Sequence, residues 1–211
     1  MKQDFHLYVI TGEQFYQGKD YLQVIEEAIL GGADIVQLRE KDKSKKELLD
    51  MAKALRSLTA RYNVPFIVND HIDIALAVDA DGIHLGQDDL PLQEARKILG
   101  PDKIIGISTH ALEEAQEAKK NGADYIGVGP VFETKSKADV VDPVGLDYVQ
   151  QVTEHVDMPY VAIGGIKLHN VQDVLKAGAR RICVISAIVG AEDVKATAAA
   201  FSQEIKRARG E

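Results

Sequence analysis

Three stretches of this sequence repeat one another: "LGGADIVQL" at residues 30–38, "NGADYIGVG" at 121–129 and "AGARRICVI" at 177–185. A fourth, "VDADGIHLG" at 78–86, is a looser copy. Each copy places glycine and alanine close to the start of an apolar run. Because glycine readily adopts the left-handed conformation that ends helices, each copy predicts a helix end, a short turn and a strand start. The repeating unit is therefore a helix followed by a strand.

Eight short apolar segments have the length and composition of strands, and segments with helical spacing separate them. The predicted strands cover residues 7–11, 35–40, 66–70, 82–86, 104–108, 125–129, 160–165 and 182–187. Predicted helices include residues 20–30, 45–62, 111–122 and 170–178. Continuously apolar strands are typical of a parallel sheet covered by helices. Eight repeats favour an α/β fold with one (β/α)₈ TIM barrel over residues 1–211, and a doubly wound open sheet is the alternative.

The composition excludes several classes of protein. With 45% hydrophobic residues the chain can bury one sizeable core. Its formal net charge of −8 argues against a nucleic-acid partner or a polybasic membrane surface, since both need clustered lysine and arginine. No apolar stretch approaches the roughly 20 residues of a membrane span, and the N-terminus does not resemble a signal peptide, so we expect a cytoplasmic protein. The single cysteine, Cys183, is expected to be a buried, inert thiol.

In a barrel, the chemistry lies at the C-terminal ends of the strands, where the loops that lead into the helices gather. Polar residues follow the predicted strands at this end. They are Gln37, Arg39 and Lys41 after the second strand, Asn69 and Asp70 after the third, Gln87, Asp88 and Asp89 after the fourth, Ser108 at the end of the fifth, residues 129–145 after the sixth, and Gly164, Gly165 and Ser186 after the last two.

The second predicted strand brings two positively charged residues, Arg39 and Lys41, to the C-terminal end of the barrel. Strand alternation places Gln37, Arg39 and Lys41 on one face and the apolar Val36 and Leu38 on the other. We therefore expect the three polar side chains at the barrel mouth, with Val36 and Leu38 packed against helices. A solvated rim is the alternative.

Two aspartates predict a metal site. Asp70 and Asp89 follow successive strands, so their carboxylates can converge on one hard cation. Mg²⁺ takes one or two protein carboxylates and completes its coordination with water and substrate phosphate oxygens, which favours a diphosphate substrate. Arg39 would grip a phosphate with two parallel hydrogen bonds, and Lys41 and Lys137 would add positive charge. Surface carboxylates or helix N-caps would explain the two aspartates equally well.

The motifs "AIGGI" at 162–166 and "VISAI" at 184–188 predict a second anion site. Loops after strands seven and eight of a barrel often bind phosphate through backbone N–H groups. Gly164 and Gly165 allow close approach of the backbone, and Ser186 offers a hydroxyl. Glycines required only for a turn are the alternative. Two phosphate sites imply two phosphorylated small-molecule ligands.

A series of motifs then resembles a known family over nearly the whole chain. In order they are "QLREK", "VND", "DGIHLGQDD", "IIGIS", "GADYIGVGPVF", "KAD", "PVGL", "AIGGI" and "VISAI". Together they resemble the thiamine phosphate synthase family. The resemblance implies a transferase that condenses 4-amino-2-methyl-5-pyrimidinylmethyl diphosphate with 4-methyl-5-(2-phosphoethyl)thiazole, or its carboxylated form, to thiamine monophosphate and releases diphosphate. It also implies a Mg²⁺-assisted dissociative substitution through a pyrimidine carbocation, which the thiazole nitrogen attacks.

The same resemblance assigns roles to residues. It implies that the pyrimidine diphosphate is held by Gln37, Arg39, Lys41, Asn69, Ser108 and Lys137, with Arg39, Lys41, Ser108 and Lys137 acting in catalysis. It implies that Asp70 and Asp89 hold Mg²⁺. It implies that the thiazole phosphate is held by Thr134, Lys135, Ser136, Gly165, Ile185 and Ser186. The long segment 131–144 is the expected lid, which would exclude water from a reactive cation.

The sequence departs from the family in "ETKSK" at 133–137, where the family usually reads "PTxTK". Glu133 adds a negative charge near an anionic ligand, and Ser136 keeps the hydroxyl of threonine. The stretch "FET" is also similar to the sister family of thiazole tautomerases, which has histidine where Pro130 stands and lacks the paired aspartates. The intact metal pair and Lys137 favour the synthase.

Other classes of protein, two histidines and the oligomeric state also have to be considered. A non-catalytic phosphate-metabolite barrel, or a sugar-phosphate isomerase, would not need both the aspartate pair and the basic second strand. His84 and His110 lie near strand ends, where we expect hydrogen-bonded structural roles. Helix faces rich in Ala and Leu would suit a homo-oligomer but must also pack on the barrel, so the oligomeric state is left open.

Overall fold

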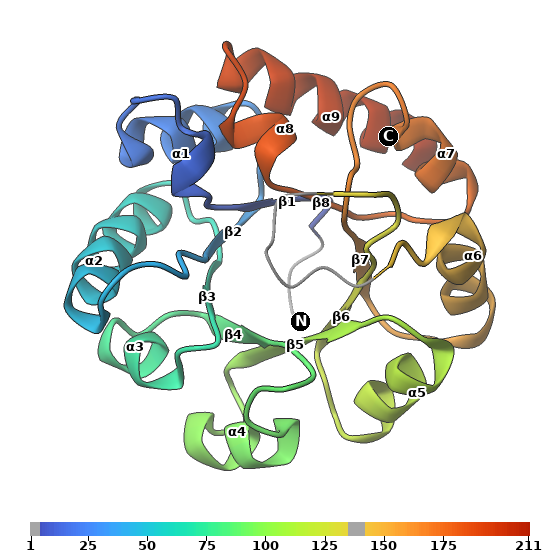
Figure 1. The fold of residues 1–211 in the computed structure, drawn as a ribbon, viewed down its shortest axis with the longest axis horizontal. Helices are drawn as coiled ribbons and strands as arrows, with labels where there is room; N and C mark the ends of the chain where they lie inside the picture. The colour runs from blue at the N-terminus through green and yellow to red at the C-terminus, as the bar shows by residue number, and fades with distance from the viewer. Residues whose placement is uncertain (1–4, 135–141) are drawn as a thin grey trace.

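The computed structural model describes residues 5–134 and 142–211 of the chain, in which eight parallel strands close into a barrel in the order β1 to β8 (Figure 1). The strands are β1 Leu7–Ile10, β2 Ile35–Leu38, β3 Phe66–Asn69, β4 Gly82–Leu85, β5 Ile104–Thr109, β6 Tyr125–Val128, β7 Tyr160–Ala162 and β8 Ile182–Val184. The predicted TIM barrel is confirmed. Since β1 pairs with both β2 and β8, the open sheet is excluded.

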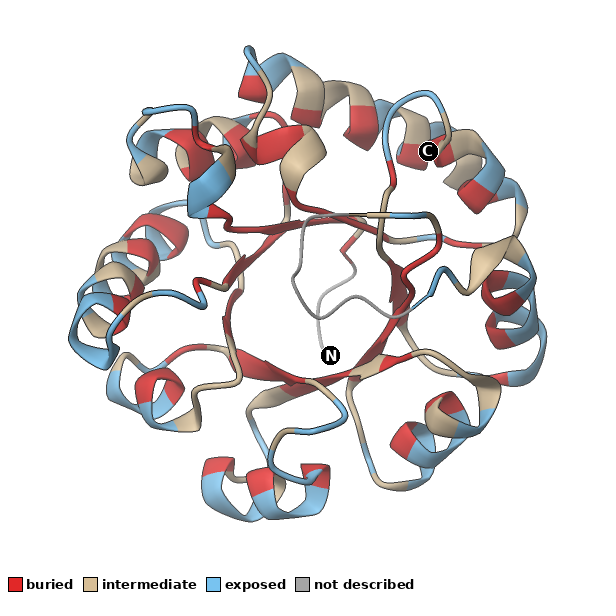
Figure 2. Cartoon of the chain, in the orientation of Figure 1, coloured by how far each residue is buried: buried red, intermediate tan, exposed pale blue. Residues whose placement is uncertain are grey.

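Helices surround the barrel and turn their apolar faces inward (Figure 2). They are α1 Tyr21–Leu30, α2 Lys45–Arg61, α3 Ile72–Ala77, α4 Leu92–Leu99, α5 Leu112–Lys120, α6 Gly145–His155, α7 Val171–Lys176, α8 Ser186–Val189 and α9 Val194–Arg209, with a 3₁₀ turn η1 at Glu13–Phe15. The strands are buried on both sides, which explains their continuous apolar sequences. No helix in the described residues is long and apolar enough to cross a membrane.

The repeated sequence motif has the predicted structural role. Gly32, Gly122 and Gly178 follow α1, α5 and α7 and all have positive φ angles, of 110°, 88° and 108°. The aspartate of the motif closes the N-terminal end of the barrel. Asp34 accepts hydrogen bonds from the backbone N–H groups at the start of β1, and Asp124 accepts one from Ile105 N at 2.8 Å.

Several predicted strands extend too far toward the C-terminal end. The strand predicted for residues 35–40 ends at Leu38, because the next residue donates its N–H to a side chain and not to the sheet. The strand predicted for residues 182–187 ends at Val184. Ile185 turns the backbone (φ −113°, ψ −98°) and Ser186 begins α8. Of the polar residues at the mouth, Asn69 and Ser108 therefore lie on β3 and β5, and the others lie on loops or at the start of α8.

Candidate active site

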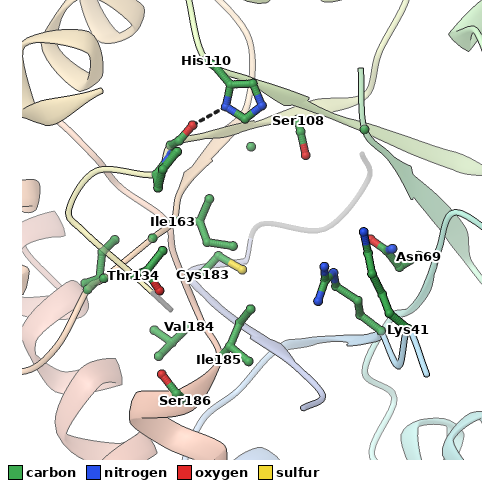
Figure 3. A pocket seen from close by; sticks show the side chains of 18 of the residues that line it. Lys41, Asn69, Ser108, His110, Thr134, Ile163, Cys183, Val184, Ile185 and Ser186 are labelled. Atoms are coloured by element: carbon green, nitrogen blue, oxygen red, sulfur yellow. Dashed lines mark hydrogen bonds between the residues drawn. The ribbon is translucent and has the colours of Figure 1, made fainter. Parts of the chain in front are cut away.

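A cavity of about 790 Å³ is formed by the loops that follow the strands (Figure 3). Ten of the residues predicted to act in the site line it: Arg39, Lys41, Asn69, Asp70, Asp89, Ser108, Thr134, Gly165, Ile185 and Ser186. They come from the C-terminal ends of β2 to β8, as the fold requires. The predicted residues Lys135, Ser136 and Lys137 lie outside the described part of the chain.

Gln37 lies elsewhere than predicted. Its side chain is 1% exposed and is not among the residues that line the cavity. Its Nε2 donates a hydrogen bond of 2.8 Å to Tyr8 Oη inside the barrel. Gln37 is therefore one layer below the mouth, and a direct contact with a substrate stays a prediction.

The cavity has two sides. Lys41 and Asn69 project into it from the ends of β2 and β3, and Thr134, Ile185 and Ser186 lie on the side of β6 and β8 (Figure 3). Ser108 approaches from β5, between the two sides. This arrangement leaves room for two ligands that face each other.

The loop after β2 is fixed to the loop after β1. Arg39 donates its N–H to Thr11 Oγ1 at 2.8 Å, and the Thr11 hydroxyl donates back to the Arg39 carbonyl at 3.2 Å. The buried carboxylate of Glu40 accepts hydrogen bonds from Glu13 N at 3.0 Å and from the Tyr16 hydroxyl at 3.2 Å. Burial raises the pKa of Glu40 above its usual range, and these donors oppose the shift. The backbone from which Arg39 extends is thus held in place.

The two predicted metal ligands meet at the ends of β3 and β4. Asp70 has a φ angle of 59°, and the residue after it bonds back to the Asn69 carbonyl at 2.7 Å, as in a γ-turn. Asp89 Oδ2 accepts the Gly86 N–H at 2.7 Å, which fixes the direction of its carboxylate. The side chains of Asp70 and Asp89 are close enough to share a hydrogen bond.

Burial and the neighbouring Asp89 both raise the pKa of Asp70. Burial, the hydrogen bond to Asp89 and the charge of Asp89 raise the pKa of Asp70 to about 6, against the opposing charges of Lys41 and Arg39. Two carboxylates held together in a partly buried site are stabilised by a cation between them.

This donor set fits Mg²⁺. Within the described residues, no group of three or more His, Cys, Asp or Glu side chains could hold a metal ion. A zinc site needs such a group. Magnesium binds through one or two carboxylates and takes its other ligands from water and phosphate. The pair of Asp70 and Asp89 at the edge of a cationic cavity meets that requirement.

We expect the affinity of the substrate-free protein for a divalent cation to fall as the pH drops through about 6. Below this pKa Asp70 holds a proton that must leave before its carboxylate can bind the metal, so each further pH unit should weaken binding about tenfold. Mn²⁺ binding followed by electron paramagnetic resonance between pH 7.5 and 5.0 would measure this. Asp102→Asn, which changes an exposed carboxylate that does not line the cavity, is the matched control and should keep the pH dependence. A constant affinity down to pH 5 would contradict the expectation.

The opposite side of the cavity is built by glycines. Gly164 and Gly165 have φ angles of 101° and 66°, and a Cβ atom on Gly165 would lie 2.6 Å from the Glu133 carbonyl oxygen. The loop after β6 therefore packs directly over these glycines. Asn170 Nδ2 donates a hydrogen bond of 3.1 Å to the Gly165 carbonyl. Ser186 begins α8, a single turn in which Ile188 N and Val189 N donate to the Ile185 carbonyl. The anion site expected at this loop stays a prediction.

Some lining residues did not figure in the sequence prediction. Lys167 lies two residues after Gly165, and Phe15 lies in the loop after β1. Both follow strands, so the rule that chemistry lies at strand ends would have found them. His110 also lines the cavity, and its Nδ1 donates to the Gly129 carbonyl at 2.6 Å. Cys183 is buried as expected, at the cavity floor (Figure 3).

A closed (β/α)₈ barrel with a carboxylate pair, cationic side chains and a glycine-built anion loop at one mouth defines a barrel enzyme that acts on phosphorylated small molecules. Comparison with known proteins narrows this class. Residues 7–188 match the family model described as thiamine monophosphate synthase. The chain belongs to this family and is a transferase.

Relatives and a solved structure agree with the family match. A thiamine-phosphate synthase from Halalkalibacterium halodurans is 67% identical over 199 residues, which cover 94% of each chain. One from Shouchella clausii is 64% identical over 204 residues, covering 97% of this chain and 98% of the relative. The solved structure of a thiamine phosphate pyrophosphorylase from Pyrococcus furiosus superimposes with a TM-score of 0.88 at 42% identity, covering 97% of this chain and 96% of the other.

Proposed function

We propose that this cavity condenses 4-amino-2-methyl-5-pyrimidinylmethyl diphosphate with 4-methyl-5-(2-phosphoethyl)thiazole, or its carboxylated form, to give thiamine monophosphate and diphosphate. The observation that supports this most directly is that the two groups of residues predicted to bind phosphorylated ligands lie on opposite sides of one cavity. The carboxylate pair and the cations of β2 occupy one side, and the glycine loop and the start of α8 occupy the other.

The diphosphate side carries the leaving-group chemistry. As the C–O bond breaks, its electron pair departs with the diphosphate, whose negative charge grows. Arg39 and Lys41 stabilise that charge more in the transition state than in the ground state, and Asn69 and Ser108 orient the substrate. Mg²⁺ held by the aspartate pair would neutralise the departing oxygens. Contacts from Gln37 and Lys137 belong to the proposal, though the former lies below the cavity and the latter outside the described residues.

The second side places the nucleophile. The thiazole phosphate would bind the backbone of Gly165 and Ile185 and the hydroxyls of Thr134 and Ser186, with Lys135 and Ser136 as further predicted contacts. Anchoring the phosphate there turns the thiazole nitrogen toward the electron-poor carbon, where its lone pair forms the new C–N bond. No side-chain nucleophile is required. Holding both partners at contact distance supplies much of the rate acceleration.

Apolar side chains between the two sides of the cavity would shield the proposed pyrimidine carbocation from water. Ile163, Val184 and Ile185 line the cavity between the polar groups (Figure 3). A pyrimidine carbocation would react with water at once, so an apolar wall favours coupling over hydrolysis. The lid expected at residues 131–144 lies partly outside the described residues, which stop at 134 and resume at 142.

The test is direct. The protein is mixed with both substrates and Mg²⁺, and thiamine monophosphate and released diphosphate are quantified, with EDTA as the control. We expect coupling that depends on Mg²⁺ and is restored by adding the metal back. If no coupling occurs while the carboxylated thiazole phosphate is isomerised, the protein acts as a thiazole tautomerase. If neither reaction occurs but both ligands bind, it is a non-catalytic metabolite-binding barrel.

The cellular setting is also part of the proposal. We propose that one catalytic domain spanning residues 1–211 acts in the cytoplasm on small molecules, with no nucleic acid or membrane partner. The sequence has one cysteine and so cannot form an internal disulfide, and proteins without disulfides are typical of reducing compartments.

A further inference from the structure

A line of five polar side chains crosses the barrel interior and ends at the cavity. Gln37 Nε2 donates to Tyr8 Oη at 2.8 Å, and Tyr8 Oη lies 2.9 Å from Tyr125 Oη. Tyr125 Oη lies 2.9 Å from His84 Nδ1, and His84 Nε2 lies 3.0 Å from Ser108 Oγ. The five residues come from β2, β1, β6, β4 and β5 in that order. Of the five, Ser108 lines the cavity.

The barrel is built around this line. Tyr8 and Tyr125 are among the most deeply buried large side chains, and His84 is buried as well. Gly106 of β5 leaves the space for Tyr125, because a Cβ atom there would lie 2.1 Å from Tyr125 Cζ. Burial raises the pKa of both phenols far above their usual range, so each keeps its proton. The two phenols are therefore neutral groups in a low dielectric, where hydrogen bonds are strong.

The donor at one end sets the direction of the whole line. Since Tyr8 Oη accepts from Gln37, its own proton is available to Tyr125, and the proton of Tyr125 is then available to His84 Nδ1. A histidine that accepts at Nδ1 carries its proton at Nε2. It therefore donates to Ser108 Oγ. The Ser108 hydroxyl proton is left to point into the cavity.

The reverse direction is less favourable. Ser108 would donate to His84, which would donate to Tyr125, and Tyr125 to Tyr8. Tyr8 would then accept two hydrogen bonds, and its buried proton would need an acceptor outside these five residues. A buried donor without an acceptor costs about 1–3 kcal/mol.

We propose that Tyr125 and His84 are positioning residues, which fix the Ser108 hydroxyl as a hydrogen-bond donor toward the pyrimidine diphosphate. This inference rests on the proposed function. A hydroxyl that already points its proton into the cavity stabilises an acceptor whose negative charge grows and needs no reorganisation during the reaction. Reversed, the same hydroxyl would turn its lone pairs toward an anion.

A double-mutant cycle tests whether Tyr125 acts through Ser108. We expect Tyr125→Phe to lower kcat about tenfold, the effect of one hydrogen bond worth about 1.4 kcal/mol, with little change in the KM of the thiazole phosphate. In a Ser108→Ala background, Tyr125→Phe should cause no further loss. Tyr160→Phe is the matched control. It removes a buried tyrosine hydroxyl that is bonded to Thr153 at 2.6 Å, away from this line, and should leave kcat unchanged.

A spectroscopic measurement tests the direction of the line without the reaction. We expect ¹⁵N NMR of the wild-type protein to show His84 protonated at Nε2, and Tyr125→Phe or Tyr8→Phe to shift it toward the other tautomer. His84→Gln places an amide near the Nε2 position and should retain more activity than His84→Ala.

Three results would overturn the inference: protonation of His84 at Nδ1 in the wild type, a Tyr125→Phe loss that adds fully to that of Ser108→Ala, or an unchanged kcat in Tyr125→Phe. Failure of the proposed function is a different result. In that case the wild-type protein makes no thiamine monophosphate, while the NMR measurement still reports the tautomer of His84.

Discussion

Asp89→Asn is expected to lower the rate of thiamine monophosphate formation by about 10²–10³-fold, the loss typical when one charge-stabilising group is removed from an active site. The amide can still accept the Gly86 N–H that Asp89 Oδ2 accepts at 2.7 Å, so the loop after β4 should keep its shape. What is lost is the negative charge beside Asp70, and with it most of the attraction for a divalent cation. Steady-state rates across a Mg²⁺ titration would measure this.

Two further variants, assayed in the same way, separate a loss of metal binding from a loss of stability. Asp89→Ala removes both the charge and the acceptor for Gly86, so it should lose more activity than the amide variant and some stability. Asp102→Asn changes an exposed carboxylate that does not line the cavity by the same chemistry and should behave like the wild type. Wild-type turnover in Asp89→Asn at ordinary Mg²⁺ concentrations would remove this residue from the metal site.

Local sequence was sufficient to predict the fold. Each copy of the Gly-Ala-Asp repeat predicts its own helix end and strand start. Its glycine ends a helix, and its aspartate binds the backbone at the N-terminal end of the barrel. The eight strands run parallel because a helix connects each strand to the next. The sequence predicts that β2 and β8 extend further along the chain than they do. β2 ends where the Arg39 N–H bonds to a side chain, and β8 ends where the backbone turns into α8.

The site was predicted as far as strand alternation and strand ends allow. Ten predicted residues line one cavity, because the barrel brings every strand end to one mouth. Alternation gives the correct face for Gln37 but not its depth. Gln37 is buried inside the barrel, where it donates to Tyr8 from β1, and Tyr8 in turn contacts Tyr125 from β6. Contacts among side chains from five strands leave no local sequence pattern, so the line of hydrogen bonds to Ser108 required the structure.

Arg39→Ala is expected to weaken binding of inorganic diphosphate about 10²-fold, measured by isothermal titration calorimetry in the presence of Mg²⁺. Two charge-assisted hydrogen bonds from one guanidinium contribute about 1.5–3 kcal/mol each to a buried phosphate, and part of that energy is offset by desolvation. The backbone clamp between Arg39 and Thr11 does not depend on the side chain, so the loop should survive the substitution. The rate of coupling should fall at least as far as diphosphate binding.

Arg39→Lys distinguishes charge from geometry. Lysine keeps the positive charge but offers a single ammonium group in place of a planar fork, so it should recover only about tenfold of the lost affinity. Lys45→Ala is the control for the loss of one positive charge, since Lys45 is exposed and paired with Asp73 at 2.8 Å, outside the cavity. If Lys45→Ala weakens diphosphate binding as much as Arg39→Ala, the effect comes from the general field of the protein. If Arg39→Ala binds diphosphate like the wild type, the leaving group lies elsewhere in the cavity.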